Sequence, residues 1–403
     1  MRVIILLVLL PSFYFSQAWV KLPDFPGTKR DDGTAVVVNN KAYFGTGLQE
    51  GWTSTVDFYC FDLTTKNWST IANMPNGTER QYARAFKGNN GFYVFGGDGP
   101  TGALNNLFKY DIATNTWSLM ANKPGAGLIG PACFEFGNKV IIAGGKTSTA
   151  GVNSAEVWEY DLSNNSWTQK NNFPYTPRWH ACTAVINGNG YMVFGQAPND
   201  SCGTELYTYN PSNDTWQQLS DIPIPKGRSY ARMEALSNRL VLFGGVNCYG
   251  EHYKDMWHYN FSTQLWKQNI DLPSFERRGG MSCTDGNYFY YACGYSPIEG
   301  RLKEVWRTDI PLSIKNIEEQ NALKLYPNPA QHKLYVMVDN IETSTLHINF
   351  TSVFGNKMEF ASNKIKVENG EMIIDVSELN SGVYLLSLET ESGQIGAAKV
   401  IIK

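Results

Sequence analysis

The sequence lacks a basic excess, a high content of charge and, after its first residues, any long apolar run. Lys and Arg number 34 against 37 Asp and Glu, which gives a net charge of −3, so nucleic acid is not expected as a partner. No later stretch is apolar enough over sufficient length to cross a membrane as a helix. Charged residues make up 18% of the 403 residues and aromatic residues 13%, which excludes a disordered chain.

Motifs for catalysis and metal binding are also scarce. No Gly-x-Ser-x-Gly nucleophile elbow occurs, and the seven cysteines form no Cys-x-x-Cys pair, so hydrolase and zinc motifs are missing. Only three of the five histidines precede residue 311, and His180 and His252 make at most a weak metal pair. Isolated loop histidines are more typical of hydrogen-bonded groups, so the sequence predicts no metal and no cofactor.

The N-terminus has the features of a secretory signal. Arg2 is followed by the apolar run VIILLVLL, and small residues stand at Ser16 and Ala18. We therefore predict a signal peptide over residues 1–18 and a mature chain without a transmembrane segment. A buried N-terminal strand is the alternative. Export would bring the cysteines into an oxidising compartment, where their odd number leaves at least one unpaired.

A repeat of 49 or 50 residues dominates the next part of the chain. Segments such as LFKYDIATNTW and VWEYDLSNNSW end on tryptophans at this spacing: Trp68, Trp117, Trp167, Trp216 and Trp266. Short apolar runs end on glycine six times: Gly45, Gly96, Gly144, Gly195, Gly244 and Gly294. Each repeat has the pattern of four short antiparallel strands joined by turns. Four-stranded units at this period are typical of a β-propeller.

The ends of the repeat region predict how the ring closes. The sixth repeat has three strands but no fourth strand opened by tryptophan, and the segment AWVKLPDFP supplies a match for it. We expect the strand at Trp19 to complete the sixth blade. The predicted fold class is all-β, a six-bladed propeller over residues 19–311 followed by a small C-terminal β-sandwich.

These repeats resemble kelch repeats. A double glycine ends the second strand, Tyr-Asp closes the third, and tryptophan opens the fourth. The glycine pair is degraded at three places: Gly45-Thr46, Gly195-Gln196 and Gly294-Tyr295. The resemblance covers about residues 19–311 and implies a kelch-type propeller in which these residues have structural roles.

The C-terminal part differs in composition, because no Trp, Arg or Cys follows Arg307. We predict a linker at 312–322 and a β-sandwich at 323–403. Tyr326-Pro327-Asn328-Pro329, the segment VFGNKM and the ending LNSGVY resemble the type A C-terminal sorting domain of the type IX secretion system. That resemblance implies a Gram-negative source, recognition of residues 323–403 by this machinery, and a product secreted or attached to the outer-membrane surface. A carbohydrate-binding sandwich is the alternative.

Arginines open the first strand of five repeats: Arg30, Arg80, Arg178, Arg228 and Arg278. Blades two and five share an Arg-x-Tyr-x-Arg pattern and lie three blades apart, so their second arginines should face each other across the axis. We expect an acidic sugar or polysaccharide to bind near the channel mouth on the loop side, because guanidiniums bind carboxylates bidentately. The candidate residues are Arg80, Tyr82, Arg84, Arg178, His180, Arg228, Tyr230, Arg232 and Glu234. The alternative for the leading arginines is a structural bond to loop carbonyls.

Two functions of different classes remain open. The first is a monomeric surface protein that binds glycan or protein at the loops, where Trp52, Trp179 and Tyr249 either stack on sugars or pack. The second is an enzyme that resembles N-acetylneuraminate mutarotase (an epimerase), which uses an acid and an arginine. Arg228, Arg232 and Glu234 share one inner strand and match that requirement.

Two disulfide pairings are also open. Cys202 and Cys248 fall in neighbouring loops, just after the glycines of blades four and five. Cys283 and Cys293 flank a turn between adjacent strands. Either pairing requires Cα atoms within about 7 Å, which spacing in the sequence does not establish.

Overall fold

The computed structural model describes residues 19–261, 263–308, 323–337, 347–352, 357–359, 365–368, 371–390 and 393–403. The predicted signal peptide and linker lie outside these ranges. The chain divides into two compact units, residues 1–310 and 311–403, and each is described by itself. Within the described ranges, no helix has the length and apolar character needed to cross a membrane.

The first unit contains one four-stranded antiparallel sheet for each predicted repeat. Blade one consists of β3 (Thr34–Val38), β4 (Lys41–Gly45), β7 (Phe58–Asp62) and β8 (Trp68–Thr70), and blade two of β9 (Arg84–Gly88), β10 (Gly91–Phe95), β13 (Leu107–Asp111) and β14 (Thr116–Leu119). Blade three consists of β15 (Ala132–Phe136), β16 (Lys139–Ala143), β17 (Val157–Asp161) and β18 (Ser166–Gln169), and blade four of β19 (Cys182–Ile186), β20 (Asn189–Val193), β21 (Leu206–Asn210) and β22 (Thr215–Gln218). Blade five consists of β24 (Arg232–Leu236), β25 (Arg239–Phe243), β27 (Met256–Asn260) and β28 (Leu265–Gln268). The sixth blade holds β29 (Met281–Thr284), β30 (Phe289–Ala292), β33 (Val305–Thr308) and β1 (Val20–Leu22). The predicted all-β propeller is confirmed.

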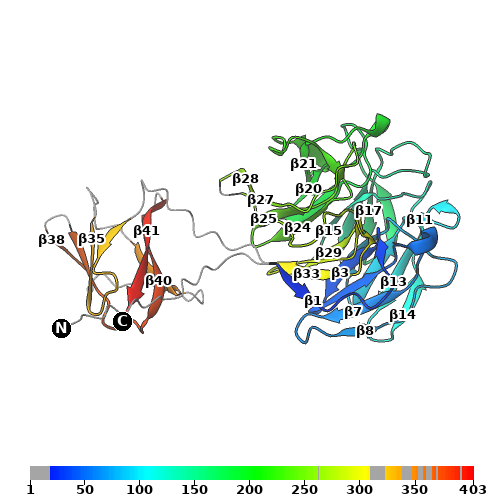
Figure 1. Cartoon of the computed structure of the whole chain (residues 1–403). Helices are drawn as coiled ribbons and strands as arrows, with labels where there is room; N and C mark the ends of the chain where they lie inside the picture. The colour runs from blue at the N-terminus through cyan, green and yellow to red at the C-terminus, as the bar shows by residue number, and fades with distance from the viewer. Residues whose placement is uncertain are drawn as a thin grey trace. The chain divides into compact units, whose positions relative to one another are not determined.

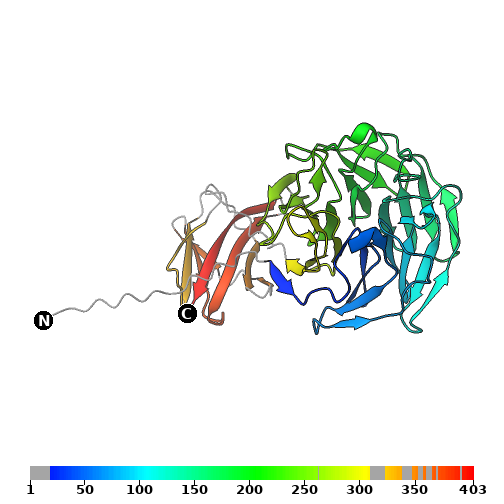
Figure 2. The same ribbon diagram turned by 45° about the vertical axis from the view of Figure 1, so that its right-hand side comes forward.

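Figure 2 shows the blades arranged around a common axis, and their first strands lie innermost, because these strands contact one another. Each of these strands contacts the first strand of the next blade, and β29 contacts β3, so the series returns to its start. Strand β1 lies beside β33, with Val20 opposite Arg307 and Leu22 opposite Val305 (Figure 1). The N-terminal strand therefore completes the last blade, as the unmatched tryptophan segment predicts.

The repeated tryptophans connect consecutive blades. The indole Nε1 of Trp117 donates to the carbonyl of Ala72 at 2.8 Å, at the edge of the preceding blade. Trp19 makes the same kind of bond to the carbonyl of Ile270 at 3.0 Å. Because a buried indole N–H needs an acceptor, the tryptophan period follows from blade-to-blade contact.

The two ends of the blades differ in their loops. Loops into the first strand and loops between strands two and three emerge at one end, the loop face, and the hairpins between strands one and two emerge at the other, the hairpin face. Small sheets and turns occupy the loop face: β2 (Arg30–Asp31), β5 (Leu48–Gln49), η1 (Glu50–Trp52), β6 (Thr53–Ser54), β11 (Asp98–Gly99), β12 (Gly102–Ala103), η2 (Pro198–Asp200), β23 (Arg228–Ser229), β26 (Val246–Asn247), β31 (Tyr295–Ser296) and β32 (Gly300–Arg301).

The second unit consists of two four-stranded antiparallel sheets around one apolar core. One sheet has the order β34 (Lys324–Tyr326), β35 (Lys333–Met337), β39 (Glu371–Asp375), β38 (Ile365–Glu368); the other has the order β37 (Lys357–Glu359), β36 (His347–Ser352), β40 (Gly382–Thr390), β41 (Gly393–Ile402). Leu334, Ile374, Phe350 and Leu386 from both sheets are buried together. This arrangement is the predicted sandwich.

Candidate functional site

The leading arginines are buried inside their own blades rather than gathered at the channel mouth. Arg80 Nη1 donates to the carbonyl of Gly96 at 3.1 Å and to Asn106 Oδ1 at 2.9 Å. Arg228 repeats this geometry, donating to the Gly244 carbonyl at 3.1 Å and bidentately to the Asp255 carboxylate at 2.6 and 2.7 Å. The same kind of contacts hold Arg30 to Thr46 and Asp57, and Arg178 to Phe194 and Glu205.

This placement changes the sequence-based expectation for Arg80, Arg178 and Arg228, whose guanidiniums are occupied by loop carbonyls and polar side chains. It also corrects the arginine series in the sixth blade. Arg277, buried and bonded to Glu304 at 2.7 Å, takes the structural position. Arg278 instead approaches Asp32 at 3.2 Å. The physical reason is the register: Arg277 stands four residues before the first strand β29, as Arg228 stands four residues before β24.

Three aromatic side chains meet at the loop end of the axis. The His180 ring stacks on Tyr230 with centroids 4.0 Å apart, and Tyr82 lies 4.5 Å from His180 and 5.9 Å from Tyr230. All three have a left-handed backbone, with φ of 52°, 56° and 62° for His180, Tyr230 and Tyr82. At the equivalent place in blade three stands Gly130, and a Cβ there would lie 3.0 Å from the His180 ring, so a side chain would press against the ring. We call Tyr82, His180 and Tyr230 the axial plug.

Below the axial plug lies a cavity of about 520 Å³ along the propeller axis. All six first strands contribute to its walls, with Arg84, Arg232, Glu234, Glu135 and Ser282 among the polar side chains. Tyr82, His180 and Tyr230 are not among the lining residues. Lys87 and Glu135, near the hairpin ends of β9 and β15, are the solvent-exposed members. The cavity therefore meets solvent at the hairpin face, opposite to the expected mouth.

Arg84 and Arg232 lie in opposite blades at the inner end of this cavity. Arg84 donates from Nε to the Pro131 carbonyl at 2.6 Å and from Nη2 to the Ala181 carbonyl at 3.2 Å. Arg232 bonds the Gly280 and Gly33 carbonyls in the same way, at 2.5 and 3.4 Å. Burial, together with the charge of Arg232, lowers the pKa of Arg84 to about 10. Among the described contacts, Nη1 of each arginine has no protein partner, so these donors remain for a ligand.

Two glutamates share the cavity with these arginines. Enclosure by the six blades raises the pKa of Glu234 to about 7, although Ser282 Oγ donates to its Oε1 at 2.6 Å. Enclosure likewise raises the pKa of Glu135 to about 7, and the charge of Glu234 adds to this effect. Glu135 lies at the solvent-exposed end of the cavity, where its carboxyl accepts a hydrogen bond from the Lys87 backbone N–H at 3.1 Å that opposes this rise. Two carboxyls that titrate near neutrality can act as a general acid and a general base.

Sequence reasoning brought Arg84, Arg232 and Glu234 together but missed Glu135. The available signal was an acidic residue inside the otherwise apolar first strand of blade three, Ala132–Phe136. A carboxyl at that place is unusual unless it faces a water-filled channel. Its approach to Glu234, from a blade two positions away, is visible only in the folded ring.

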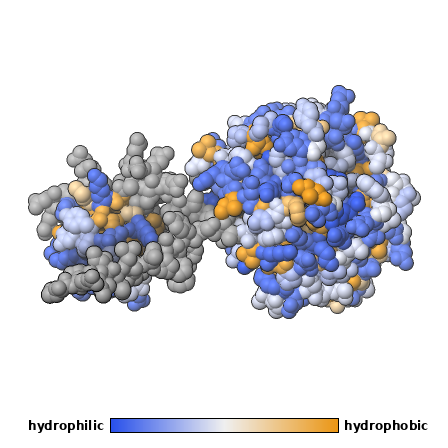
Figure 3. Space-filling view, viewed as in Figure 1, coloured by the Kyte–Doolittle hydropathy of each residue, from blue (hydrophilic) through white to orange (hydrophobic). Residues whose placement is uncertain are grey.

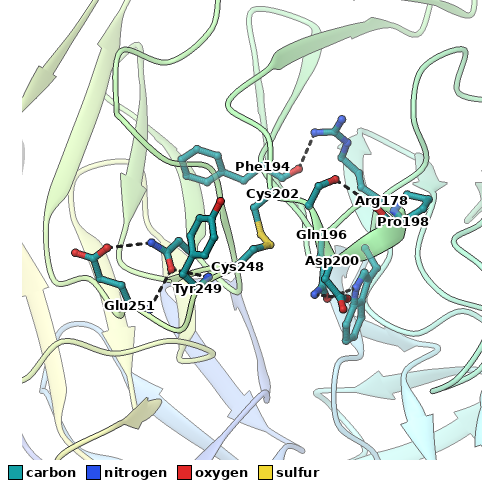
Figure 4. Close-up of a disulfide and its surroundings, with 12 residues drawn as sticks. Arg178, Phe194, Gln196, Pro198, Asp200, Cys202, Cys248, Tyr249 and Glu251 are labelled. Carbon is teal, nitrogen blue, oxygen red and sulfur yellow. Dashed lines mark hydrogen bonds between the residues drawn. A yellow bond between two sulfur atoms is a disulfide. The ribbon is translucent and has the colours of Figure 1, made fainter.

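The cysteines fall into one bonded pair and five free thiols among the described residues. Cys202 and Cys248 form a disulfide with Cα atoms 5.8 Å apart, which links loops of blades four and five (Figure 4). Cys283 and Cys293 do not pair, and both are buried as free thiols. The register explains this difference, because Cys283 lies opposite Tyr290 rather than opposite Cys293.

We expect the Cys202–Cys248 disulfide to stabilise the propeller by about 2–4 kcal/mol, since it closes a long loop between residues 46 positions apart. Urea unfolding of the wild type and of a Cys202→Ser/Cys248→Ser double variant measures this difference. A reducing agent should lower the midpoint of the wild type and leave that of the variant unchanged. Equal midpoints for both oxidised proteins would contradict the expectation.

Comparison with known proteins adds three findings. The family model described as "KLHDC2/KLHL20/DRC7 Kelch-repeats domain" matches residues 130–340, and the "Kelch motif" model matches residues 80–124. The model described as "Secretion system C-terminal sorting domain" matches residues 324–403. These matches confirm the resemblances predicted from the repeats and from the C-terminal motifs.

Among curated proteins, the chain is similar to two bacterial epimerases. N-acetylneuraminate epimerase of Pasteurella multocida (strain Pm70) is 28% identical over 321 residues, 69% of this chain and 80% of the relative. The protein of the same name from Haemophilus influenzae (strain PittEE) is 24% identical over 329 residues, 66% of this chain and 85% of the relative. A solved structure titled "Structure of YjhT" aligns with a TM-score of 0.61 at 18% identity, covering 70% of this chain and 96% of that one, and supports the fold.

Proposed function

We propose, on the premise that this chain belongs to the kelch-repeat family and ends in a secretion system C-terminal sorting domain, that it is an exported sugar-acid epimerase. Its axial cavity would bind the sugar acid and interconvert the two anomers. Residues 323–403 would engage the type IX secretion machinery, and the mature propeller would act as a monomer outside the cell or on its surface.

The observation that carries this proposal is the convergence of two guanidiniums and two carboxyls in one enclosed cavity. A volume of about 520 Å³ lies within the usual range of about 300–1,000 Å³ for small-molecule sites. Arg84 and Arg232 each keep Nη1 for the substrate carboxylate, and charge-assisted bonds of this kind are strong. Because the arginines bind the substrate carboxylate, Glu135 and Glu234 are available to exchange protons with the substrate.

Anomer exchange needs only proton transfers and opening of a ring. A carboxylate removes the proton of the anomeric hydroxyl while a carboxylic acid protonates the ring oxygen, and the bond between that oxygen and the anomeric carbon breaks. In the open form, rotation about the bond between the anomeric carbon and the adjacent sugar carbon turns the other face of the new carbonyl toward the hydroxyl. Ring closure with the reverse proton transfers then gives the other anomer. Glu234 is the better base because the hydrogen bond from Ser282 and the charges of Arg232 and Arg84 all favour its carboxylate. Glu135 also accepts a hydrogen bond, from the Lys87 backbone N–H, but the charge of Glu234 favours its protonated form, so Glu135 is assigned as the acid.

The relatives support this assignment at the level of the reaction class. Two proteins named N-acetylneuraminate epimerase are similar to this chain over two thirds of its length. Their named substrate is a sugar acid, which agrees with paired arginines in the cavity. We therefore propose N-acetylneuraminate as the first substrate to test.

Two-dimensional exchange NMR on N-acetylneuraminate, with and without the full chain, tests the proposal directly. Accelerated exchange between the anomer signals supports the epimerase. Binding without acceleration would instead favour the second candidate, a glycan-binding protein that uses the same arginines. If the chain neither binds a sugar acid nor accelerates its anomer exchange, both candidate functions are rejected.

We expect Arg84→Met and Arg232→Met each to weaken binding of N-acetylneuraminate by about 10–100-fold, because each removes hydrogen bonds to a charged ligand. Isothermal titration calorimetry measures the affinity. Lys139→Ala is the matched control, since it removes one positive charge from an outer strand where Lys139 pairs with Glu159. Unchanged affinity in both arginine variants would show that the ligand does not bind at this end of the cavity.

A further inference from the structure

Two aromatic side chains stand almost fully exposed on the loop face. Trp52 is 78% exposed and Tyr249 is 86% exposed, although most aromatic residues of the propeller are buried between blades. On the side of the propeller in Figure 3 the surface is mainly hydrophilic, with small separate apolar patches. Trp and Tyr are enriched among the residues that dominate binding, so two such rings on one polar face form a candidate recognition surface.

Trp52 is held in place from beneath. The guanidinium carbon of Arg301 lies 4.9 Å from the centroid of the ring, and Arg301 Nε donates to Asp31 Oδ1 at 2.7 Å. Both Arg301 and Asp31 are buried, so the support is rigid. The Trp52 backbone has φ of 59°, which is costly for a bulky residue and tends to be retained where function requires it. One face of the ring is thus fixed and the other faces solvent.

Tyr249 is positioned by a different device. It follows Cys248 of the disulfide, and its backbone N–H donates to Asn247 Oδ1 at 2.9 Å (Figure 4). Lys226 Nζ lies 5.5 Å from its ring centroid. The backbone of Tyr249 is thus fixed by the disulfide and by Asn247, while its ring projects into solvent.

The surface between the two rings belongs to blade six. The Tyr295 ring lies 6.0 Å from His252 of blade five, and Ile298 at the tip of the β31–β32 hairpin is 66% exposed. Trp52 itself reaches from blade one to Arg301 of blade six. The aromatic arc, defined as Trp52, Ile298, Tyr295 and Tyr249, therefore crosses blades one, six and five.

The cationic side chains next to the aromatic arc are each paired with a carboxylate. Arg301 bonds Asp31, Arg278 approaches Asp32 at 3.2 Å and Asp31 at 3.4 Å, and Lys226 pairs with Glu251 at 3.1 Å. The surface thus offers apolar ring faces and hydrogen-bonding groups without a net positive charge. This differs from the acidic ligand that the arginine series predicts for the loop face.

We propose that the aromatic arc binds a neutral polysaccharide, with pyranose rings stacked on Trp52 and Tyr249. A pyranose presents a flat face of C–H groups to an aromatic ring and its hydroxyls to the sides, and it is stiff enough to lose little entropy on binding. Fixed aromatic rings lower the cost of ordering the protein. The site lies at the opposite end of the propeller from the cavity mouth, so it does not depend on the proposed epimerase activity.

Affinity electrophoresis of the full chain in native gels containing dextran, starch or galactomannan tests this inference, with alginate as the acidic comparison. At least one neutral polysaccharide should retard the wild type equally at low and high salt. Trp52→Ala should weaken retardation at least tenfold, Tyr249→Ala should weaken it less, and Trp52→Phe should keep most of it. Leu265→Ala, which removes another largely exposed apolar side chain (67% exposed) from an outer strand, is the control and should behave as wild type.

Four results would overturn the proposal. One is that no neutral polysaccharide retards the wild type, and another is that Trp52→Ala is retarded as strongly as the wild type. The third is retardation by alginate alone that disappears with salt, which would indicate charge recognition. If sedimentation shows self-association that Trp52→Ala removes, the rings bind a second copy of the chain and the polysaccharide assignment is wrong.

Discussion

Replacement of Glu234 by Gln is expected to reduce the rate of anomer exchange by about 10²–10⁴-fold, the usual contribution of a general base. The amide keeps the size of the side chain and can still bond Ser282, so the fold should be retained. Exchange NMR at saturating substrate measures the rate. A loss smaller than tenfold, with the wild type active, would contradict the role of Glu234 as base.

The pH profile sharpens this prediction. With pKa values of about 7 for both carboxyls, the wild-type rate should be highest near pH 7. It should fall at lower pH as the base is protonated, and at higher pH as the acid loses its proton; the two apparent pKa values belong to the pair. Glu234→Gln should lose the acidic limb. Its alkaline limb should move to lower pH, because the neighbouring charge that raises the pKa of Glu135 is gone.

Ser282→Ala is the matched control for this profile. Without the donated hydrogen bond, the pKa of Glu234 should rise, so the acidic limb should move to higher pH with a modest loss of rate.

The pH dependence of the free energy of unfolding provides an independent readout. The folded protein holds these protons above the usual carboxyl pKa, so its stability should fall as pH rises from about 4.5 to 7. Glu234→Gln should make that fall smaller.

Arg228→Leu is expected to destabilise the propeller by about 3–5 kcal/mol, since it removes one partner of a buried ion pair. Arg228 is 4% exposed and its partner Asp255 is 15% exposed, so the remaining carboxylate is poorly solvated. The substitution also leaves the Gly244 carbonyl without its donor. Urea unfolding followed by tryptophan fluorescence measures the change.

Blades two and three suggest the control for this prediction. Blade two pairs its arginine with Asn106, and blade three has Leu128 in place of the arginine. In an Arg228→Leu/Asp255→Asn double variant no unpaired charge remains, and the amide can still accept from Trp257, as Asp255 does at 2.7 Å. The double variant should therefore be more stable than Arg228→Leu alone. Equal destabilisation of both would show that the lost carbonyl bonds, rather than the charge, dominate.

The two groups of arginines show how one motif serves two purposes. Arg80 and Arg228 fasten the loops between strands two and three, whereas Arg84 and Arg232, four residues later, reach the axis. The first role repeats in several blades because every blade needs that loop fixed. The second occurs in opposite blades, where two guanidiniums can face one substrate.

The sequence by itself determined the architecture of this protein. The tryptophan and glycine periods reveal the blades, because each four-stranded unit must bury both faces against its neighbours and so repeats the same contacts. The unmatched segment at Trp19 predicted how the ring closes, and the motifs after residue 323 predicted the sorting domain. Arg84, Arg232 and Glu234 were also identified as channel groups, since residues on first strands face the axis.

Only the tertiary structure decided which end of the channel is open and which side chains are free to bind. The axial plug brings together Tyr82, His180 and Tyr230 from three blades, although 98 and 50 residues separate them in sequence, and their rings close the loop end. Glu135 comes close enough to Glu234, from a blade two positions away, for their charges to interact, and Arg228 donates to Asp255 of the loop between strands two and three. A repeat period reports contacts that every blade shares, whereas these contacts occur at particular positions and depend on the curvature of the closed ring.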